Sequence, residues 1–253
     1  MAWVLDLDGV IWLSDRPIPG AAEAVARLRA VGQRVEFVTN NSSSRLGEQE
    51  DKLAVMGIDA GGAVVTSAMA AAAMLEPGTS ALVCGGPGVV EALTARGVQV
   101  ADDEDDGAVD AVVVGFNRRF DYDALRRAAC GVLGGARLIG TNDDATYPTP
   151  SGPIPGGGSI LAAVAYAAGV EPEVAGKPFP PMTDLVRTVV GSEDLVVVGD
   201  RPSTDGRFAR SLGARFALVL SGVTKAEELP VEPEPDVVAV DLAALVDAEL
   251  SGS

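Results

Sequence analysis

Acidic, hydroxyl and amide side chains follow three apolar runs of this chain, and each run is typical of a short buried strand. The runs end at Leu5, Val38 and Val198. In an open parallel sheet, ligands bind outside the carboxyl ends of the strands, so side chains that are distant in sequence would meet there. The residues concerned are Asp6 and Asp8, Thr39 and Asn40, and Asp200 and Asp205.

A lysine completes a set of groups that suits phosphoryl transfer. Lys177 stands in a Gly-Lys-Pro loop and is one of three lysines among 19 basic residues. Carboxylate oxygens can hold Mg²⁺, the metal neutralises phosphate charge, and a lysine and backbone amides bind the remaining oxygens. One aspartate is then left to act as a nucleophile and to form an aspartyl-phosphate.

The composition excludes several other classes of protein. The chain has no histidine, which rules out Ser-His-Asp triads, histidine zinc sites and phosphohistidine chemistry. The formal net charge of −17 argues against a nucleic-acid binder, because phosphate contacts need a basic surface. A small phosphorylated metabolite remains compatible with this charge, since a local pocket can be positive on a negative protein.

The sequence favours a cytoplasmic protein without a membrane span. No segment approaches the roughly 20 unbroken apolar residues of such a span, and the first eight residues, with two aspartates, are not typical of a signal peptide. Cys84 and Cys130 lie far apart and give no metal-binding spacing. The acidic run from Asp102 to Asp106 is typical of a solvated loop.

Strand-like and helix-like segments alternate along the chain, which predicts an α/β fold with a doubly wound parallel sheet. We expect the core in residues 1–77 and 174–253, and a smaller α/β domain in residues 78–173, where a second alternation begins after Glu76-Pro77-Gly78. A long loop rich in turn-forming residues, 140–158, falls in this inserted part; loops of that length are usually functional or mobile.

Four segments resemble, in order, the motifs of the haloacid dehalogenase-like superfamily. They run from Asp6 to Val10, from Val38 to Ser42, from Gly176 to Pro178 and from Val198 to Asp205. Any one alone is weak, but all four in order are specific. The chain is most similar to the NagD-like, para-nitrophenylphosphatase branch, because it also carries a Thr-Asn-Asp, Tyr-Pro and Pro-Gly-Gly-Gly-Ser segment between Thr141 and Ser159.

This resemblance implies a role for each matched residue. Asp6 would be the nucleophile and Asp8 the general acid and base, and Thr39, the Asn40 backbone and Lys177 would bind the phosphoryl group. Mg²⁺ would be held by Asp6, the Asp8 carbonyl and Asp200. Asp205 would contact these ligands or reach the metal through a water molecule. The candidates for contacting the leaving group are Asn142, Asp144, Tyr147 and Pro148.

Spacing selects among the relatives. The interval between Asp8 and Thr39 is too short for a sizeable domain, whereas the interval from Thr39 to Lys177 is ample for one, the arrangement called a C2 cap. Dehalogenases normally lack the second aspartate, Asp8 here, and the phosphonate-cleaving relatives need a cap lysine that this chain lacks. In the fourth motif, Pro202 and Gly206 replace the usual aliphatic residues, which puts the start of the next helix in doubt.

The sequence therefore predicts a Mg²⁺-dependent phosphatase of small phosphomonoesters, such as glycerol phosphate, phosphoglycolate, a nucleotide or a sugar phosphate. One alternative is a non-catalytic phosphate-binding or regulatory module with the same fold. Another is a dinucleotide-binding dehydrogenase, suggested by the glycines between Gly85 and Gly88, although the GxGxxG spacing is missing. A homodimer is compatible with the sequence.

Overall fold

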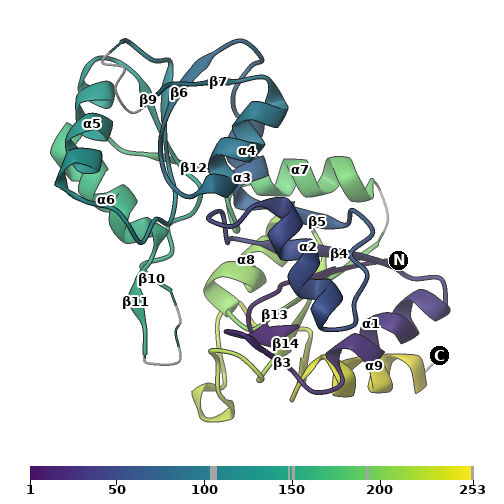
Figure 1. The fold of residues 1–253 in the computed structure, drawn as a ribbon. Coiled ribbons are helices and arrows are strands. Elements are labelled where there is room, and N and C mark those ends of the chain that lie inside the picture. The colour runs from purple at the N-terminus through teal and green to yellow at the C-terminus, as the bar shows by residue number, and fades with distance from the viewer. Residues whose placement is uncertain (103–106, 148, 150–151, 192–193, 252–253) are drawn as a thin grey trace. The chain divides into compact units, whose positions relative to one another are not determined.

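The computed structural model describes residues 1–102, 107–147, 149, 152–191 and 194–251 (Figure 1). By their contacts these residues divide into two compact units. The first unit is Met1–Thr39, Gly47–Val65 and Lys177–Ser253, and the second is Asn40–Leu46 and Thr66–Gly176. The sequence had predicted domain boundaries after residues 77 and 173; here residues 66–77 group with the second unit. The acidic run at 103–106 and Pro148 lie outside the described residues.

The first unit is built on a six-stranded sheet of the described residues, in the order β15-β14-β13-β1-β4-β5. The strands β1, β4, β13, β14 and β15 pair in parallel, with Leu5 opposite both Phe37 and Val198. The bounds are β1 (Ala2–Leu5), β4 (Arg34–Thr39), β5 (Val64–Thr66), β13 (Leu195–Gly199), β14 (Arg215–Val219) and β15 (Val237–Ala239). The parallel α/β core that the alternation predicts is thus confirmed.

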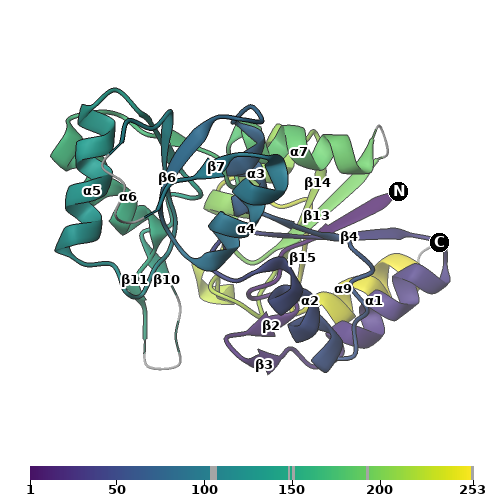
Figure 2. The same ribbon diagram turned by 45° about the horizontal axis from the view of Figure 1, so that its top comes forward.

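Helices cover both faces of this sheet. Helices α1 and α9 pack against each other on one side and α7 lies on the other (Figure 2). The bounds are α1 (Ala21–Ala30), α2 (Leu46–Val55), α7 (Pro180–Val190), α8 (Arg207–Ser211) and α9 (Leu242–Ser251), with a 3-10 turn at Ala226–Glu228. Strand β1 is fully buried, as expected for a central strand covered on both faces.

Two short elements of the first unit were not predicted. The chain after β1 turns back into a small antiparallel hairpin, β2 (Trp12–Leu13) with β3 (Arg16–Pro17). After β13 the chain makes a π-helical turn, Pro202–Gly206, before α8 starts at Arg207. A Cβ on Gly206 would lie 2.8 Å from a Pro233 side-chain carbon and 2.9 Å from the Phe216 ring. This close packing explains why glycine replaces the aliphatic residue that the motif usually carries there.

The second unit contains a five-stranded parallel sheet of its described residues, in the order β12-β9-β8-β6-β7. Helices α5 and α6 enclose an apolar core on one face, which includes Val112, Leu138 and Val164, and α3 and α4 pack together on the other (Figure 1). The bounds are α3 (Ser67–Ala73), β6 (Ser80–Cys84), α4 (Pro87–Arg96), β7 (Gln99–Val100), β8 (Ala111–Val114), α5 (Tyr122–Leu133), β9 (Arg137–Gly140), α6 (Gly157–Ala168) and β12 (Glu173–Val174).

The long loop predicted at 140–158 contains a second small hairpin. Strand β10 (Thr146–Tyr147) pairs antiparallel with β11 (Ile154–Pro155), and Tyr147 lies opposite Ile154. The Tyr147 ring stacks on the Phe116 ring, with centroids 4.9 Å apart. Among the described residues, none of the helices combines the length and the apolar character that crossing a membrane requires.

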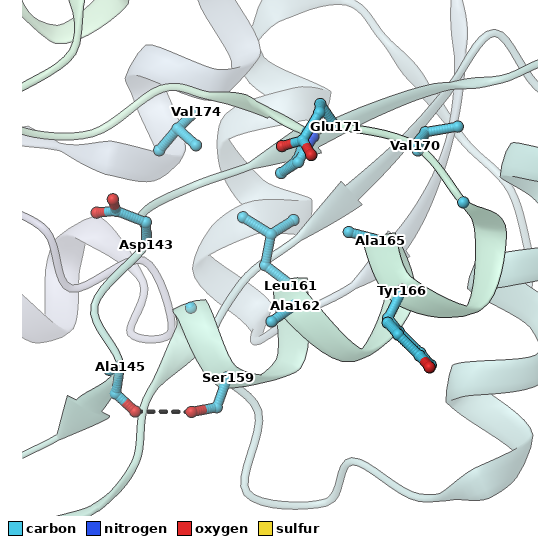
Figure 3. A pocket seen from close by; sticks show the side chains of 13 residues that line it. Asp143, Ala145, Ser159, Leu161, Ala162, Ala165, Tyr166, Val170, Glu171 and Val174 are labelled. Carbon is cyan, nitrogen blue, oxygen red and sulfur yellow. Dashed lines mark hydrogen bonds between the residues drawn. The ribbon is translucent and has the colours of Figure 1, made fainter.

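Truncation of Phe216 should destabilise the first unit strongly. Its ring is fully buried in β14 and packs under the π-helical turn, so Phe216→Ala should lower the free energy of unfolding by about 3–5 kcal/mol. Urea unfolding followed by circular dichroism measures this change. Tyr166→Ala is the control, because Tyr166 of α6 (Figure 3) is 92% exposed and its truncation should change stability by less than about 0.5 kcal/mol. Equal small effects in both variants would contradict the packing described.

Candidate active site

Three carboxylates gather at the carboxyl end of the central sheet. Asp6 follows β1 and Asp200 follows the neighbouring strand β13, and the π-helical turn brings Asp205 back to them. Each of the three can offer one oxygen such that the oxygens lie within 4.8 Å of one another. The chain runs from β1 to one side of the sheet and later returns to the other side, so this edge is the topological switch point where ligands bind in such folds.

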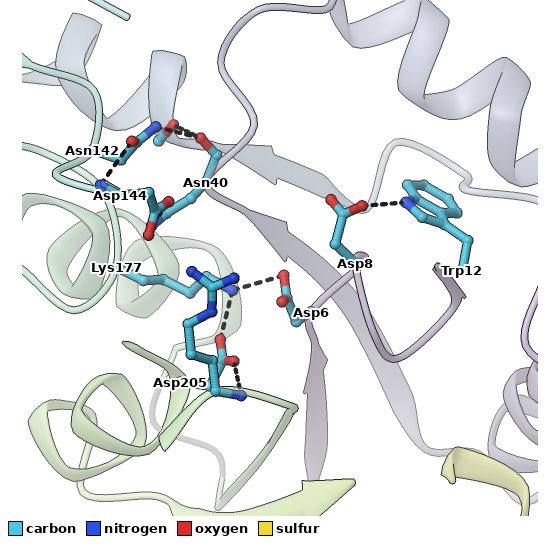
Figure 4. A network of polar contacts seen from close by, with 10 residues as sticks. Asp6, Asp8, Trp12, Asn40, Asn142, Asp144, Lys177 and Asp205 are labelled. Carbon is cyan, nitrogen blue, oxygen red and sulfur yellow. Dashed lines mark hydrogen bonds and ion pairs between the residues drawn. The ribbon is translucent and has the colours of Figure 1, made fainter. Parts of the chain in front are cut away.

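Lys177 is the cation among these acids (Figure 4). Its ammonium lies 2.8 Å from Asp6 Oδ1 and 2.8 Å from Asp205 Oδ1, and only 3% of its side chain is exposed. Burial lowers the pKa of Lys177, but the carboxylates of Asp205 and Asp6 raise it by more, so the net shift is upward. Lys177 therefore carries a fixed positive charge.

Burial has the opposite effect on the carboxyl groups, because it raises their pKa values. Burial raises the pKa of Asp6 well above its usual value; Lys177 lowers it, while Asp205 and Asp200 raise it further. Burial, and then the charge of Asp205, raise the pKa of Asp200 to about 6. Asp205 has both oxygens engaged, one by Lys177 and the other by the Arg201 N–H. One buried cation is thus insufficient for these acids.

Two glycines leave room for the Asp200 carboxylate. A Cβ on Gly9, whose φ is +86°, or on Gly222 would collide with the Asp200 side chain. The Val223 N–H donates to Asp200 Oδ2 at 2.5 Å, and the Ser221 hydroxyl donates to the Gly9 carbonyl at 2.6 Å. The loop after β14, which carries Ser221 and Val223, therefore fixes the orientation of the Asp200 side chain.

A set of three carboxylates fits a divalent cation. Oxygen ligands are what Mg²⁺ takes in proteins, and the raised pKa values of Asp6 and Asp200 indicate a cluster that a further positive charge would stabilise. Asp6 and Asp200 are the members best suited to hold the ion directly, because Asp205 is already bonded through both oxygens.

Asp8 and Thr39 complete the predicted residues of the first unit. The Asp8 side chain accepts a hydrogen bond from the Trp12 indole at 3.0 Å. Burial raises the pKa of Asp8, and Lys52 and the Trp12 bond offset this only in part. Thr39 is the last residue of β4 and is buried.

The other predicted residues lie in the second unit. The Asn142 amide donates to the Asn40 carbonyl at 2.8 Å, and Asn40 donates to Asp144 Oδ2 at 3.2 Å. Asn142 is buried and also accepts from the Asp144 N–H, so its side chain holds this loop together. Asp144 and Tyr147 are partly exposed, and Pro148 is outside the described residues.

Sequence reasoning missed Trp12 and the segment from Ser221 to Val223. The second could have been found, because the apolar run from Phe216 to Leu220 is followed by small polar residues, as the runs of the other site strands are followed by polar ones. Trp12 gave no such signal, since it lies in an apolar run that indicates burial alone.

Comparisons with known proteins agree with this geometry. A family model described as haloacid dehalogenase-like hydrolase matches residues 3–99, and one described as HAD-hydrolase-like matches residues 174–245. An acid sugar phosphatase of Staphylococcus saprophyticus is 36% identical over 240 residues, covering 92% of each chain.

Two solved structures are also similar. A p-nitrophenyl phosphatase from Archaeoglobus fulgidus has a TM-score of 0.90 and 32% identity, covering 98% of each chain. A glycerol phosphate phosphatase from Mycobacterium tuberculosis in complex with magnesium has a TM-score of 0.89 and 34% identity, covering 96% of this chain and 75% of that chain.

Crowding of the buried acids predicts an unusual pH dependence of the metal-free protein. The folded pKa of Asp6 and of Asp200 lies above the usual value, so the folded state binds more protons than the unfolded state between about pH 4 and about pH 6 or above. Stability should therefore fall as the pH rises through this window. Asp200→Asn should flatten the fall and stabilise the protein by about 1–3 kcal/mol at about pH 8.

Urea unfolding in EDTA across this pH range measures the effect. Asp236→Asn is a control of opposite sign, because a hydrogen bond from the Phe216 N–H lowers the pKa of Asp236, and its loss should destabilise the protein. An Asp200→Asn variant that is no more stable than the wild type at about pH 8 in EDTA would contradict the repulsion between the buried acids.

Proposed function

The chain belongs to the haloacid dehalogenase-like hydrolase family and is a phosphatase of it, and we propose that it hydrolyses small phosphomonoesters with Mg²⁺ through an aspartyl-phosphate on Asp6. The observation that carries the proposal is the Asp6, Asp200 and Asp205 cluster with Lys177 inside it. The matches to the family models and to the acid sugar phosphatase confirm the family that the four motifs indicated.

In the first step, Asp6 attacks the phosphorus atom and the alcohol leaves. Lys177 holds one Asp6 oxygen at 2.8 Å, which orients the carboxylate and favours its charged, nucleophilic form. Asp8 donates its proton to the leaving oxygen, and its raised pKa favours the protonated form that this step needs. In the second step, Asp8 takes a proton from water, which attacks the phosphorus and releases Asp6.

The phosphoryl oxygens would be stabilised by hydrogen-bond donors and positive charges that the fold holds in place. The Thr39 hydroxyl and the next backbone N–H, that of Asn40, are proposed to bind two of these oxygens, with Lys177 beside them. Mg²⁺, held by Asp6, Asp200 and the Asp8 carbonyl, would supply the positive charge that neutralises the phosphate. Asp205 accepts hydrogen bonds from Lys177 and from the Arg201 N–H. These bonds support a role in orienting the groups around the metal and not in binding the metal directly.

We propose phosphomonoesters of polyols or sugars as the substrates; the names of the relatives, an acid sugar phosphatase, a glycerol phosphate phosphatase and a p-nitrophenyl phosphatase, support this proposal. We propose that the loop carrying Asp144, Tyr147 and Pro148 contacts the leaving group. Asn142 supports this loop through its bonds to Asn40 and Asp144. A purely non-catalytic phosphate-binding module is less well supported, because it would not need a buried acid cluster with raised pKa values.

Replacement of the nucleophile should abolish turnover. Asp6→Asn keeps the shape of the side chain but cannot form the aspartyl-phosphate, so kcat with p-nitrophenyl phosphate and Mg²⁺ should fall by about 10³-fold or more. Phosphate release measures this loss, and EDTA should abolish wild-type activity. Asp247→Asn, the same chemical change at an exposed carboxylate, should be fully active. Activity of Asp6→Asn close to that of the wild type would refute the assignment.

Truncation at the loop should change selectivity between substrates. Tyr147→Ala removes the ring that stacks on Phe116, so the ratio of kcat/KM for glycerol 3-phosphate to that for a hexose phosphate should shift by about fivefold or more. Activity with p-nitrophenyl phosphate should change less. Tyr166→Ala, at an exposed tyrosine of the same unit, is the matched control. An unchanged ratio in Tyr147→Ala would remove this residue from the specificity loop.

A further inference from the structure

The indole of Trp12 lies directly against Asp8 (Figure 4). Its Nε1–H donates to Asp8 Oδ1 at 3.0 Å, and the residue is only 2% exposed. The contact is made by a short stretch of chain that folds back on itself. The Gly9 N–H donates to the Trp12 carbonyl at 2.6 Å, and the Trp12 N–H donates to the Leu7 carbonyl at 3.2 Å. The ring and the carboxyl group are therefore fixed relative to each other.

Lys52 packs against the face of the Trp12 ring. Its ammonium lies 4.2 Å from the centroid of the Trp12 ring, within the range of a cation–π interaction. The same ammonium donates to the Ser14 carbonyl at 2.7 Å and lies 3.6 Å from Asp15 Oδ1. Lys52 belongs to α2, so it connects this helix to the hairpin formed by β2 and β3. It holds the Trp12 ring from the face.

We infer that Trp12 is a positioning residue for Asp8 and that Lys52 holds Trp12 in place, an inference that rests on the proposed function. An indole N–H can only donate, so Oδ1 of Asp8 is the acceptor for Trp12. The carbonyl oxygen of a carboxyl group is its stronger acceptor, so this bond favours the proton on the other oxygen, which is left to serve the leaving group. When Asp8 later acts as a base, the same bond keeps that second oxygen available to water.

The other tryptophan provides a comparison within the same unit. Trp3 is 1% exposed in β1, and its Nε1 has no hydrogen-bond partner among the described residues. Burial of an indole in this protein therefore does not by itself require a carboxylate acceptor. The simpler explanation for Trp12, packing of an apolar ring, accounts for its burial but not for the bond to Asp8.

Leaving-group dependence separates positioning from packing. The value of kcat/KM covers the steps up to departure of the alcohol, and a poor leaving group needs the proton from Asp8 more than a good one does. We would measure kcat/KM with Mg²⁺ for aryl and alkyl phosphates of increasing leaving-group pKa. Trp12→Phe should lower the value for p-nitrophenyl phosphate by about threefold or less, and that for glycerol 3-phosphate by about tenfold or more.

Three further variants complete the test. Trp3→Phe, the same chemical change without a carboxylate partner, should leave the leaving-group dependence of the wild type unaltered. Lys52→Met should steepen the dependence in the same direction as Trp12→Phe but less, and Lys52→Arg should restore it. Because the Lys52 side chain is partly exposed, Lys52→Met carries the test if Trp12→Phe does not fold.

The outcomes are distinguishable. A steeper dependence in Trp12→Phe and in Lys52→Met supports the positioning role. An equal loss for all esters, or no loss, overturns it and leaves Trp12 as a packing residue. A wild-type protein that hydrolyses none of the esters overturns the proposed function, and the positioning role with it. An active wild type with parallel losses overturns the positioning role alone.

Discussion

The buried ammonium of Lys177, held 2.8 Å from both Asp6 and Asp205, is the interaction on which the rest of the site depends. Removing charged groups from water is expensive, and several like charges in one place add repulsion to that cost. A single lysine compensates for part of this charge, as the raised pKa values of Asp6 and Asp200 indicate. A divalent cation would compensate for the remaining negative charge.

The fold makes this arrangement possible because its strands end together. Asp6 and Asp200 follow the adjacent strands β1 and β13, which pair from Ala2 opposite Leu195 to Leu5 opposite Val198. The apolar strands supply a rigid, buried platform, and the loops after them supply small residues. Gly9 and Gly222 leave the space that the Asp200 carboxylate occupies. Packing of the apolar strands therefore stabilises the sheet, and the charge repulsion between the buried acids is confined to its carboxyl edge.

Much of the platform could be predicted from the sequence. The run from Leu195 to Val198 is apolar throughout and ends before Asp200, which identifies both a central strand and a site residue. Helix α1 follows the same logic, because Ala21, Val25 and Leu28 recur at helical spacing in the sequence and are all buried in the helix. The hairpin of β2 and β3 was missed, because two-residue strands carry no periodic signal. The π-helical turn was missed as well, since packing of Gly206 against Phe216 is a tertiary effect.

The roles of individual polar residues were harder to predict than their presence. Asn142 matched a motif, but its side chain is engaged by Asn40 and Asp144, which only the folded loop reveals. The bond from Trp12 to Asp8 connects residues four positions apart and depends on the backbone doubling back after β1. A motif identifies the chemistry that is available; the contacts around it decide how each group is oriented.

Chemical trapping of the covalent intermediate tests the central claim most directly. Acid quenching of the protein during turnover with Mg²⁺ and p-nitrophenyl phosphate, followed by borohydride reduction, converts an aspartyl-phosphate to homoserine, which peptide mass spectrometry can locate. The account predicts homoserine at position 6, and none when Asp6→Asn is treated in the same way. An active protein that yields no homoserine at position 6, or yields it at another aspartate, would contradict the assignment of Asp6 as the nucleophile.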